Sequence, residues 1–240
     1  MPVKPARPHV LIAGGARGIG WDIAEAMLEA GYSATVTGLT GDEVAAVPSL
    51  PHLDAVRLDV SSDADVGKVL AGIGRLDALV NCAGIIMWGS EYDKAAFRKV
   101  LDVNLTGTMC MCVGARPKLA ACGRSAIVNT VSMLSFFGGA QVPTYAASKG
   151  GVAQLTKSLA VAWAGDGIRV NAIAPGWIAT GLNRALSEDE ARSAVIRART
   201  PMQRWGEPAD IGGSVVYLCS QAARLVTGAT LPIDGGYAVM

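Results

Sequence analysis

The chain has 240 residues, of which 51% are apolar and 17% charged, and a chain of this length buries roughly 70–75% of its unfolded surface in one domain. Its net charge of +1 gives no electrostatic reason to expect nucleic acid or an anionic membrane as a partner. No apolar run reaches the roughly 18 residues that a membrane-spanning helix needs. The sparse surface charge favours a homo-oligomer. The five cysteines, odd in number and without a signal peptide, favour the reducing cytoplasm.

Short apolar runs alternate with segments of helical periodicity along the whole chain. The predicted strands cover residues 9–13, 33–37, 55–59, 77–81, 125–131, 168–173 and 229–233. The predicted helices cover residues 18–30, 62–72, 93–103, 105–121, 145–164, 186–199 and 208–219, and 41–47 has room for about two helical turns. This alternation predicts an α/β fold with a seven-stranded parallel sheet, helices on both faces and right-handed crossovers. No linker divides the chain, so residues 1–240 are expected to form a single domain.

The first predicted strand runs directly into the turn Gly14-Gly15-Ala16-Arg17-Gly18-Ile19-Gly20, and a helical pattern follows. Glycines let a backbone approach a pyrophosphate closely, and the N-terminus of a helix offers amide donors and a favourable dipole. The order of strand, turn and helix therefore predicts a dinucleotide-binding turn. A tight turn without a ligand is the alternative.

Tyr145 and Lys149 stand four residues apart in a helical pattern, so their side chains are expected on one helix face. A tyrosine has an ordinary pKa of about 10, and a neighbouring positive charge lowers it toward the working range. Ser132 follows the predicted strand 125–131, where its hydroxyl can bind a substrate oxygen while Tyr145 moves the proton. The spacing alone is weak evidence, because a polar pair on a helix surface has the same pattern.

Further motifs, in the same order along the chain, resemble those of the short-chain dehydrogenase/reductase family from about residue 8 to the C-terminus. The family's glycine turn corresponds to residues 13–20, with Ala13 in place of a threonine. Its N-N-A-G element corresponds to residues 81–84, its structural asparagine to Asn104, and its P-G-x-x-x-T element to residues 175–180. An ordered set of motifs is far more specific than any single one. The resemblance implies a single-domain Rossmann fold.

The resemblance also implies an oxidoreductase that passes hydride between a nicotinamide cofactor and a carbinol carbon. Tyr145 would be its acid or base, Ser132 would bind the same oxygen, and Lys149 would hold the nicotinamide ribose. Asn104 would hold a water that links Lys149 to solvent, or it would simply kink or cap its helix. The implied cofactor contacts are Gly14, Ala16, Arg17, Gly18, Ile19, Gly20, Asp59, Val60, Asn81, Ala83, Gly84, Tyr145, Lys149, Pro175, Gly176, Ile178 and Thr180.

Roles within this set are assigned by motif. Asp59 and Val60 would meet the adenine, although an aspartate followed by two serines also caps a turn. Residues 81–84 would line the adenosine ribose, and Ile178 and Thr180 would meet the nicotinamide carboxamide. No metal is expected, since the two histidines, His9 and His52, fall at the first predicted strand and in a loop, where neither is a plausible base or ligand.

The choice between NADP and NAD depends on the end of the second predicted strand. Enzymes that use NAD usually place an acid there to bind the ribose 2′-hydroxyl, and this chain has Gly38 instead. Arg17 stands in the glycine turn where relatives often contact the 2′-phosphate, so NADP is favoured. NAD remains the alternative, because Asp42 or Glu43 could fold back toward the ribose.

The substrate is expected to be a small ketone or secondary alcohol, with a polyol or sugar included. Residues 175–207 follow the sixth predicted strand and are expected to cover the substrate, or to be a plain surface insertion. The expected pocket residues, each of which could equally be core, are Ile86, Met87, Trp88, Met133, Leu134, Phe136, Phe137, Gln141, Trp177 and Leu182. Their apolar and aromatic character favours a small molecule with few hydroxyl groups.

Two other functions remain open. The commonest bacterial relative of this length is the 3-oxoacyl-acyl-carrier-protein reductase, which typically presents basic residues near its entrance. The corresponding positions here are Gly123 and Asp166, and this departure weakens that interpretation. A dinucleotide-binding regulator without turnover would have no need of a phenol and an ammonium side by side. Family members are commonly tetramers, so a homotetramer is expected.

Overall fold

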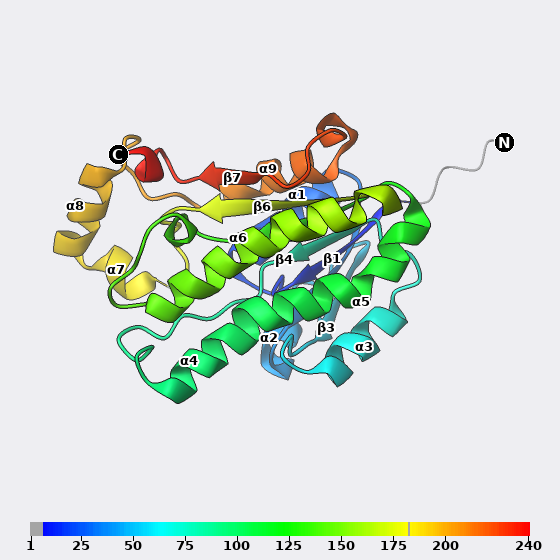
Figure 1. The fold of residues 1–240 in the computed structure, drawn as a ribbon, viewed down its shortest axis with the longest axis horizontal. Coiled ribbons are helices and arrows are strands. Elements are labelled where there is room, and N and C mark those ends of the chain that lie inside the picture. The colour runs from blue at the N-terminus through cyan, green and yellow to red at the C-terminus, as the bar shows by residue number, and fades with distance from the viewer. Residues whose placement is uncertain (1–6, 182) are drawn as a thin grey trace.

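The computed structural model describes residues 7–181 and 183–240, so Leu182 lies outside the described residues. Within them, one seven-stranded parallel sheet has the strand order β3-β2-β1-β4-β5-β6-β7 (Figure 1). The strands are β1 His9–Ala13, β2 Ser33–Gly38, β3 Leu53–Arg57, β4 Ala78–Asn81, β5 Ser125–Thr130, β6 Ile168–Pro175 and β7 Thr230–Ile233. The predicted parallel α/β fold is confirmed.

The connections between strands are helical. The α-helices are α1 Gly18–Glu29, α2 Gly41–Ala45, α3 Asp63–Gly72, α4 Lys94–Leu101, α5 Gly107–Cys122, α6 Pro143–Trp163, α7 Arg184–Glu188, α8 Glu190–Arg199 and α9 Ala209–Cys219. The π-helical turn η1 covers Asp102–Thr106, and the short 3₁₀ turns are η2 Met133–Ser135, η3 Ala164–Asp166, η4 Gln221–Ala223 and η5 Tyr237–Val239. No helix among these residues combines the length and the apolar character needed to cross a membrane.

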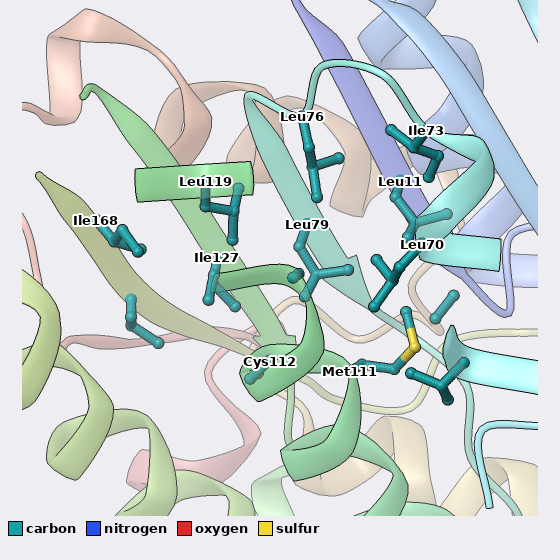
Figure 2. Close-up of a cluster of buried hydrophobic side chains, with 14 of the residues drawn as sticks. Leu11, Leu70, Ile73, Leu76, Leu79, Met111, Cys112, Leu119, Ile127 and Ile168 are labelled. Atoms are coloured by element: carbon teal, nitrogen blue, oxygen red, sulfur yellow. The ribbon is translucent and has the colours of Figure 1, made fainter. Parts of the chain in front are cut away.

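The sheet is buried on both faces because successive side chains of a strand point to opposite sides. Leu11 of β1, Leu79 of β4 and Ile127 of β5 pack against α3 and α5, where Leu70 and Met111 meet them (Figure 2). The neighbouring residues of the same strands belong to a second core under α1 and α9. This double burial explains why the strands are apolar throughout rather than alternating.

Several predicted boundaries differ from the structure, and three of these differences have a clear physical reason. β3 ends at Arg57, two residues earlier than predicted, because its register with β2 ends where Gly38 faces Arg57. The predicted break at residue 104 is absent, since η1 joins α4 to α5 as a π-helical turn. The predicted helix 186–199 is divided at Asp189, whose carboxylate accepts the backbone N–H of Arg192 and caps α8.

Gly20 at the start of α1 tests how tightly the glycine turn is packed. A Cβ at this position would collide with the carbonyl oxygen of Gly14, whereas Gly213 in α9 has open space around it. Gly20→Ala is expected to lower the free energy of unfolding by about 2 kcal/mol or more, and the control Gly213→Ala to raise it by about 0.5–1 kcal/mol. Urea denaturation of both variants measures this, and equal effects would contradict the packing.

Candidate active site

The candidate site lies at the carboxyl edge of the sheet, where ligands bind in open α/β folds. The glycine turn follows β1 there, residues 81–84 end β4, and Ser132 lies two residues beyond β5. Helix α6 crosses the same edge and carries Tyr145 and Lys149 in its first two turns (Figure 1). The fold therefore brings together groups that are more than a hundred residues apart in the chain.

Tyr145 and Lys149 share one face of α6, as their spacing predicts. The Lys149 Nζ lies 5.7 Å from the centroid of the Tyr145 ring. It also donates a hydrogen bond of 2.7 Å to the carbonyl oxygen of Thr130, the last residue of β5. Lys149 is 4% exposed and Ser132 is 7% exposed, so both polar groups are held in a largely water-free setting.

Burial dominates the electrostatics of this pair. It raises the pKa of Tyr145 to about 12, while a hydrogen bond with Ser132 opposes the rise and the nearby Cys82 and Glu91 add to it. Burial also lowers the pKa of Lys149 to about 8. In the protein alone, burial therefore outweighs the lowering of the Tyr145 pKa that the sequence predicts for a neighbouring Lys149.

Asn104 sits in η1 and is fully buried. Its Oδ1 accepts the backbone N–H of Ile85 at 2.8 Å, and its Nδ2 donates to the Ile85 carbonyl at 2.9 Å and to the Ser148 hydroxyl at 3.1 Å. A Cβ at Gly84 would lie 3.3 Å from Asn104 Oδ1 and 3.5 Å from Lys149 Nζ, so both groups adjoin Gly84. The helix distortion at Asn104 is present, and the water relay stays a prediction.

The glycine turn has the shape and the free donors that a pyrophosphate needs. Gly14 approaches residue 83 so closely that a Cβ would lie 2.7 Å from the Ala83 backbone. Gly18 has a left-handed φ of 57°, and the nearest atom to its Cβ position is the Thr180 methyl, 4.0 Å away across the sheet edge. Helix α1 begins with no side-chain cap at Arg17 and no acid in its first turn. Its first amides and its dipole are therefore available to an anionic group.

Thr37 on β2 makes up for Ala13, which replaces the family's threonine in the turn. The Thr37 hydroxyl accepts the backbone N–H of Gly14 at 3.1 Å, and its carbonyl accepts that of Ala16 at 3.1 Å. The turn is thus tied to the neighbouring strand rather than stabilised by its own side chain.

Two predicted adenosine contacts serve the fold instead. The Asn81 amide donates to Asn129 Oδ1 at 2.9 Å inside the sheet, so this buried side chain joins β4 to β5. Val60 is buried and packs where a Cβ at Gly107 would lie 2.7 Å from its methyl group. Only their backbones can take part in ligand binding.

Asp59 caps the turn after β3, which is the role that the sequence offers as the alternative to an adenine contact. One of its carboxylate oxygens accepts both the backbone N–H of Ser61 at 2.9 Å and the Ser61 hydroxyl at 2.6 Å. These hydrogen bonds lower the pKa of Asp59. The turn after β3 is therefore closed by this side chain, whose contact with an adenine stays a prediction.

The remaining predicted cofactor contacts follow β6. Pro175 ends the strand, and Gly176 lies against Asp234 of the C-terminal turn, where a Cβ would be 2.6 Å from the Asp234 backbone. Ile178 is 3% exposed and packs in the core. Thr180 is partly buried and its backbone N–H donates to Asn183 Oδ1 at 3.1 Å.

The Glu43 side chain lies at the end of β2, which is the position that the NAD alternative requires of an acid near the ribose. One of its oxygens accepts the backbone N–H of Leu39 at 2.7 Å, and the other lies 3.0 Å from Arg17 Nε. A Cβ at Gly38 would lie 2.8 Å from the Glu43 Cβ, so the glycine makes room for this carboxylate. An acid therefore stands at the strand end although the strand itself supplies none.

An aromatic cluster, which the sequence did not reveal, lies under residues 175–207. The rings of Trp177 and Tyr237 are 6.4 Å apart, and those of Trp177 and Trp205 are 5.6 Å apart. The Arg199 guanidinium lies 4.3 Å from the Tyr237 ring centroid. A cavity of about 350 Å³ beside them is lined by Trp177, Ile178, Thr200, Met202, Arg204, Gly206, Asp210, Pro232, Ile233, Asp234, Gly235 and Gly236. These contacts join segments far apart in the sequence, so no local pattern announces them.

The other predicted pocket residues divide by exposure. Met133 is buried, whereas Trp88 and Phe136 are exposed at 39% and 53% and remain open to a ligand. Gly123 and Asp166, compared above with the entrance of an acyl-carrier reductase, instead precede β5 and β6 at the amino edge of the sheet. Asp166 is paired there with Arg116 at 2.8 Å. Among residues 7–181 and 183–240 no three His, Cys, Asp or Glu side chains form a cluster suited to a metal ion.

Comparisons with known proteins agree with the fold and the motifs. A protein-family model described as enoyl-(acyl carrier protein) reductase matches residues 14–238. A 2-dehydro-3-deoxy-D-gluconate 5-dehydrogenase from Pseudoalteromonas atlantica is 40% identical over 239 residues, which are 95% of this chain and 94% of that protein. A cis-4-hydroxycyclohexanecarboxylate dehydrogenase from Sinomonas cyclohexanicum is 38% identical over 238 residues, 95% of each chain.

A solved structure has the same fold over nearly the whole chain. The gluconate 5-dehydrogenase from Burkholderia cenocepacia J2315, in complex with NADP and tartrate, has a TM-score of 0.91 and 32% identity, and covers 97% of this chain and 96% of that chain. The chain therefore belongs to the short-chain dehydrogenase/reductase family. It is an NAD(P)-dependent oxidoreductase that acts on CH–OH groups.

The burial of Lys149 predicts that this proposed functional residue lowers the stability of the folded protein. Its pKa falls from 10.5 to about 8, so at pH 7 the folded protein carries a buried charge that disfavours folding by on the order of 3 kcal/mol. Because the unfolded chain binds the additional proton between about pH 8 and 10.5, this penalty disappears as the pH rises through that window.

Lys149→Met is therefore expected to unfold at a higher urea concentration than the wild type at pH 7, with the difference shrinking toward pH 10. Lys157→Met, on an exposed part of α6, is the control and is expected to show no such pH dependence. A Lys149→Met variant that is less stable by the same amount at both pH values would contradict the buried charge.

Proposed function

We propose that the protein transfers hydride between a nicotinamide dinucleotide and the carbinol carbon of a small secondary alcohol or its ketone, with Tyr145 as acid or base. The observation that most strongly supports this proposal is the arrangement of Tyr145, Ser132 and Lys149 at the same sheet edge as the glycine turn. Two relatives named above are dehydrogenases of 2-dehydro-3-deoxy-D-gluconate and of cis-4-hydroxycyclohexanecarboxylate, and both of these compounds are carboxylates. A hydroxyl on a small molecule that carries a carboxylate is therefore the substrate class we favour.

The residues of the chain divide the proton chemistry among them. The bound dinucleotide would supply the hydride acceptor or donor and, when oxidised, a positive ring charge. Because burial holds the pKa of Tyr145 at about 12 in the protein alone, Tyr145 is a phenol at pH 7 and can donate its proton to a ketone oxygen. Ser132 donates a hydrogen bond to the same oxygen and stabilises its developing negative charge. In oxidation, Tyr145 would first lose its own proton, which the positive ring of the oxidised dinucleotide would favour, and as the phenolate it would then take the proton of the substrate hydroxyl.

The proposed cofactor contacts follow the geometry of the sheet edge. The amides at the start of α1, at Arg17, Gly18, Ile19 and Gly20, would hold the pyrophosphate, and Gly14 and Ala16, whose own amides are bonded to Thr37, would line it. Asp59, Ala83 and Gly84, with the backbones of Val60 and Asn81, would line the adenosine. Lys149 would hold the nicotinamide ribose, with Asn104 supporting a water beside it, and Pro175, Gly176, Ile178 and Thr180 would line the nicotinamide side.

NADP is the cofactor that we favour, with NAD as the alternative. Arg17 at the N-terminus of α1 is the cation that a 2′-phosphate would meet, and its side chain is 73% exposed. The gluconate 5-dehydrogenase from Burkholderia cenocepacia has NADP bound. Glu43 opposes this choice, since its carboxylate is paired with Arg17 and would repel a phosphate.

We also propose that residues 175–207 cover the substrate, that the chain forms a homotetramer and that it is cytoplasmic. The aromatic cluster of Trp177, Trp205 and Tyr237 supports a substrate role for that segment. Phe97 and Val113, on α4 and α5, are 44% and 51% exposed, and apolar side chains on neighbouring helices are suited to a sister subunit. The five free cysteines suit a reducing compartment.

The ion pair of Arg17 and Glu43 predicts how cofactor preference responds to substitution. Glu43→Gln frees Arg17 and removes a repulsive charge, so the Kd for NADP⁺ is expected to fall about 5- to 10-fold while that for NAD⁺ changes little. Arg17→Ala is expected to weaken NADP⁺ more than tenfold. Asp42→Asn, which removes the neighbouring acid of α2, is the matched control. Quenching of tryptophan fluorescence measures the cofactor Kd of the wild type and the three variants, and unchanged NADP⁺ affinity in Glu43→Gln would remove Glu43 from this role.

The proposed reaction is tested by following absorbance at 340 nm with NADP⁺ and NAD⁺ and a panel of alcohols: D-gluconate, cis-4-hydroxycyclohexanecarboxylate and a 3-hydroxyacyl thioester. Tyr145→Phe is expected to lower kcat by roughly 10²- to 10⁴-fold because it lacks the proton that is transferred, and to bind the cofactor normally. Tyr217→Phe, on an exposed part of α9, is the control. Full turnover by Tyr145→Phe would refute the mechanism, and binding without turnover by the wild type would favour a regulator.

A further inference from the structure

Glu91 is a buried acid that the reaction described above does not use. Its side chain is 1% exposed, in the connection between β4 and α4. One carboxylate oxygen accepts the backbone N–H of Tyr145 at 2.8 Å, and the other accepts that of Met87 at 3.0 Å. Burying a carboxylate costs free energy unless hydrogen bonds compensate for the lost water, so the buried position of Glu91 needs a structural explanation.

The reason lies in how α6 begins. The residue that precedes the helix, Val142, has no side chain able to accept a hydrogen bond, and Pro143 has no N–H. The first turn still contains amide groups that lack partners within the helix, and one of them belongs to Tyr145. Glu91 satisfies this amide from a segment 54 residues away, as a capping side chain would, and its charge suits the helix dipole.

The same contact joins two walls of the candidate site. Thr144 Oγ1 donates to the Glu91 carbonyl at 3.1 Å, and Gly89 N–H donates to the Gln141 carbonyl at 3.1 Å. The Tyr92 hydroxyl donates to the Ala140 carbonyl at 3.1 Å. Residues 87–92, which carry the exposed Trp88, are thus tied to the residues that lead into α6. A shift of either segment would move the other.

The charge of Glu91 works against the chemistry that its position supports. The groups that act on the ionisation of Tyr145 are Ser132, Cys82 and Glu91, and Lys149 lies over its ring. Burial and the negative groups raise the pKa of Tyr145, and Ser132 lowers it. A residue selected to activate the phenol would be positive or neutral. Glu91 is therefore explained by geometry rather than by activation.

We propose that Glu91 is a positioning residue, which fixes the backbone of Tyr145 and couples the substrate-side segment 87–92 to the start of α6. Its carboxylate is suited to this because it accepts two backbone N–H groups from two segments at once, which an amide oxygen alone cannot do in the same geometry. The kinetic consequence rests on the proposed function of Tyr145. The structural consequence, protection of the Tyr145 amide, does not.

The test compares Glu91→Gln with Asp93→Asn. Asp93 is an acid two residues away that caps α4 through the amides of Ala95 and Ala96 and does not contact Tyr145. In Glu91→Gln, hydrogen exchange of the peptide covering residues 143–148 is expected to be faster, and kcat in the 340 nm assay to fall roughly 10- to 100-fold with cofactor Kd unchanged. In a pH profile of kcat, the limb that reports the ionisation of Tyr145 is expected to move down by about half a unit to one unit, because a negative neighbour is lost. Asp93→Asn is expected to leave these three properties unchanged.

Glu91→Asp separates reach from charge and serves if Glu91→Gln does not fold. It keeps the charge but is one methylene shorter, so kcat and protection are expected to fall while the pH limb stays in place. The proposal is overturned if both Glu91 variants keep the hydrogen-exchange rate and the kcat of the wild type. It is also overturned if the Glu91 variants lose only stability, Asp93→Asn loses the same amount, and the Tyr145 limb of the pH profile does not move. If the wild type turns over no alcohol of the panel, the proposed function fails, and the exchange measurement still decides the role of Glu91.

Discussion

The hydrogen bond from Lys149 Nζ to the Thr130 carbonyl is the interaction on which the site depends. It fixes α6 to the end of β5 at the sheet edge, and thereby sets Tyr145 beside Ser132. The bond also places an ammonium where water is scarce, which lowers the Lys149 pKa and raises the penalty of keeping it charged. The contact that positions Tyr145 therefore also destabilises the fold, because it keeps a cation away from water.

Parallel strands make such a site possible because their carboxyl ends all lie at one edge. The glycine turn, residues 81–84 and Ser132 each follow a strand, so the sheet register determines their spacing. Helix α6 is held to this edge at two points, by Lys149 from inside and by Glu91 at its N-terminus. Both side chains bond to the backbone, Lys149 at Thr130 and Glu91 at Tyr145, and their shared role is to hold Tyr145 in place.

Local patterns were sufficient where chemistry depends on spacing within one element. The four-residue spacing predicted the shared face of Tyr145 and Lys149, and the glycines predicted the turn after β1. Patterns did not reveal contacts that span the sequence. The motif predicts that Asn81 lies beside the adenosine ribose, and it gives no sign that the Asn81 side-chain amide donates to Asn129 of the neighbouring strand. Glu91 was missed for the same reason, since an acid in an irregular segment resembles an ordinary surface residue.

The sequence by itself determined the parallel α/β fold, the family and the order of the functional groups, because hydrophobic periodicity and motif spacing are local properties. The tertiary structure alone decided the electrostatics. Burial, which no sequence pattern measures, places the pKa of Tyr145 at about 12 instead of below its ordinary value. The tertiary structure also decided that Glu43, rather than a residue of β2, supplies the acid near Arg17. Desolvation and long-range contact depend on which surfaces meet, and only the folded chain defines them.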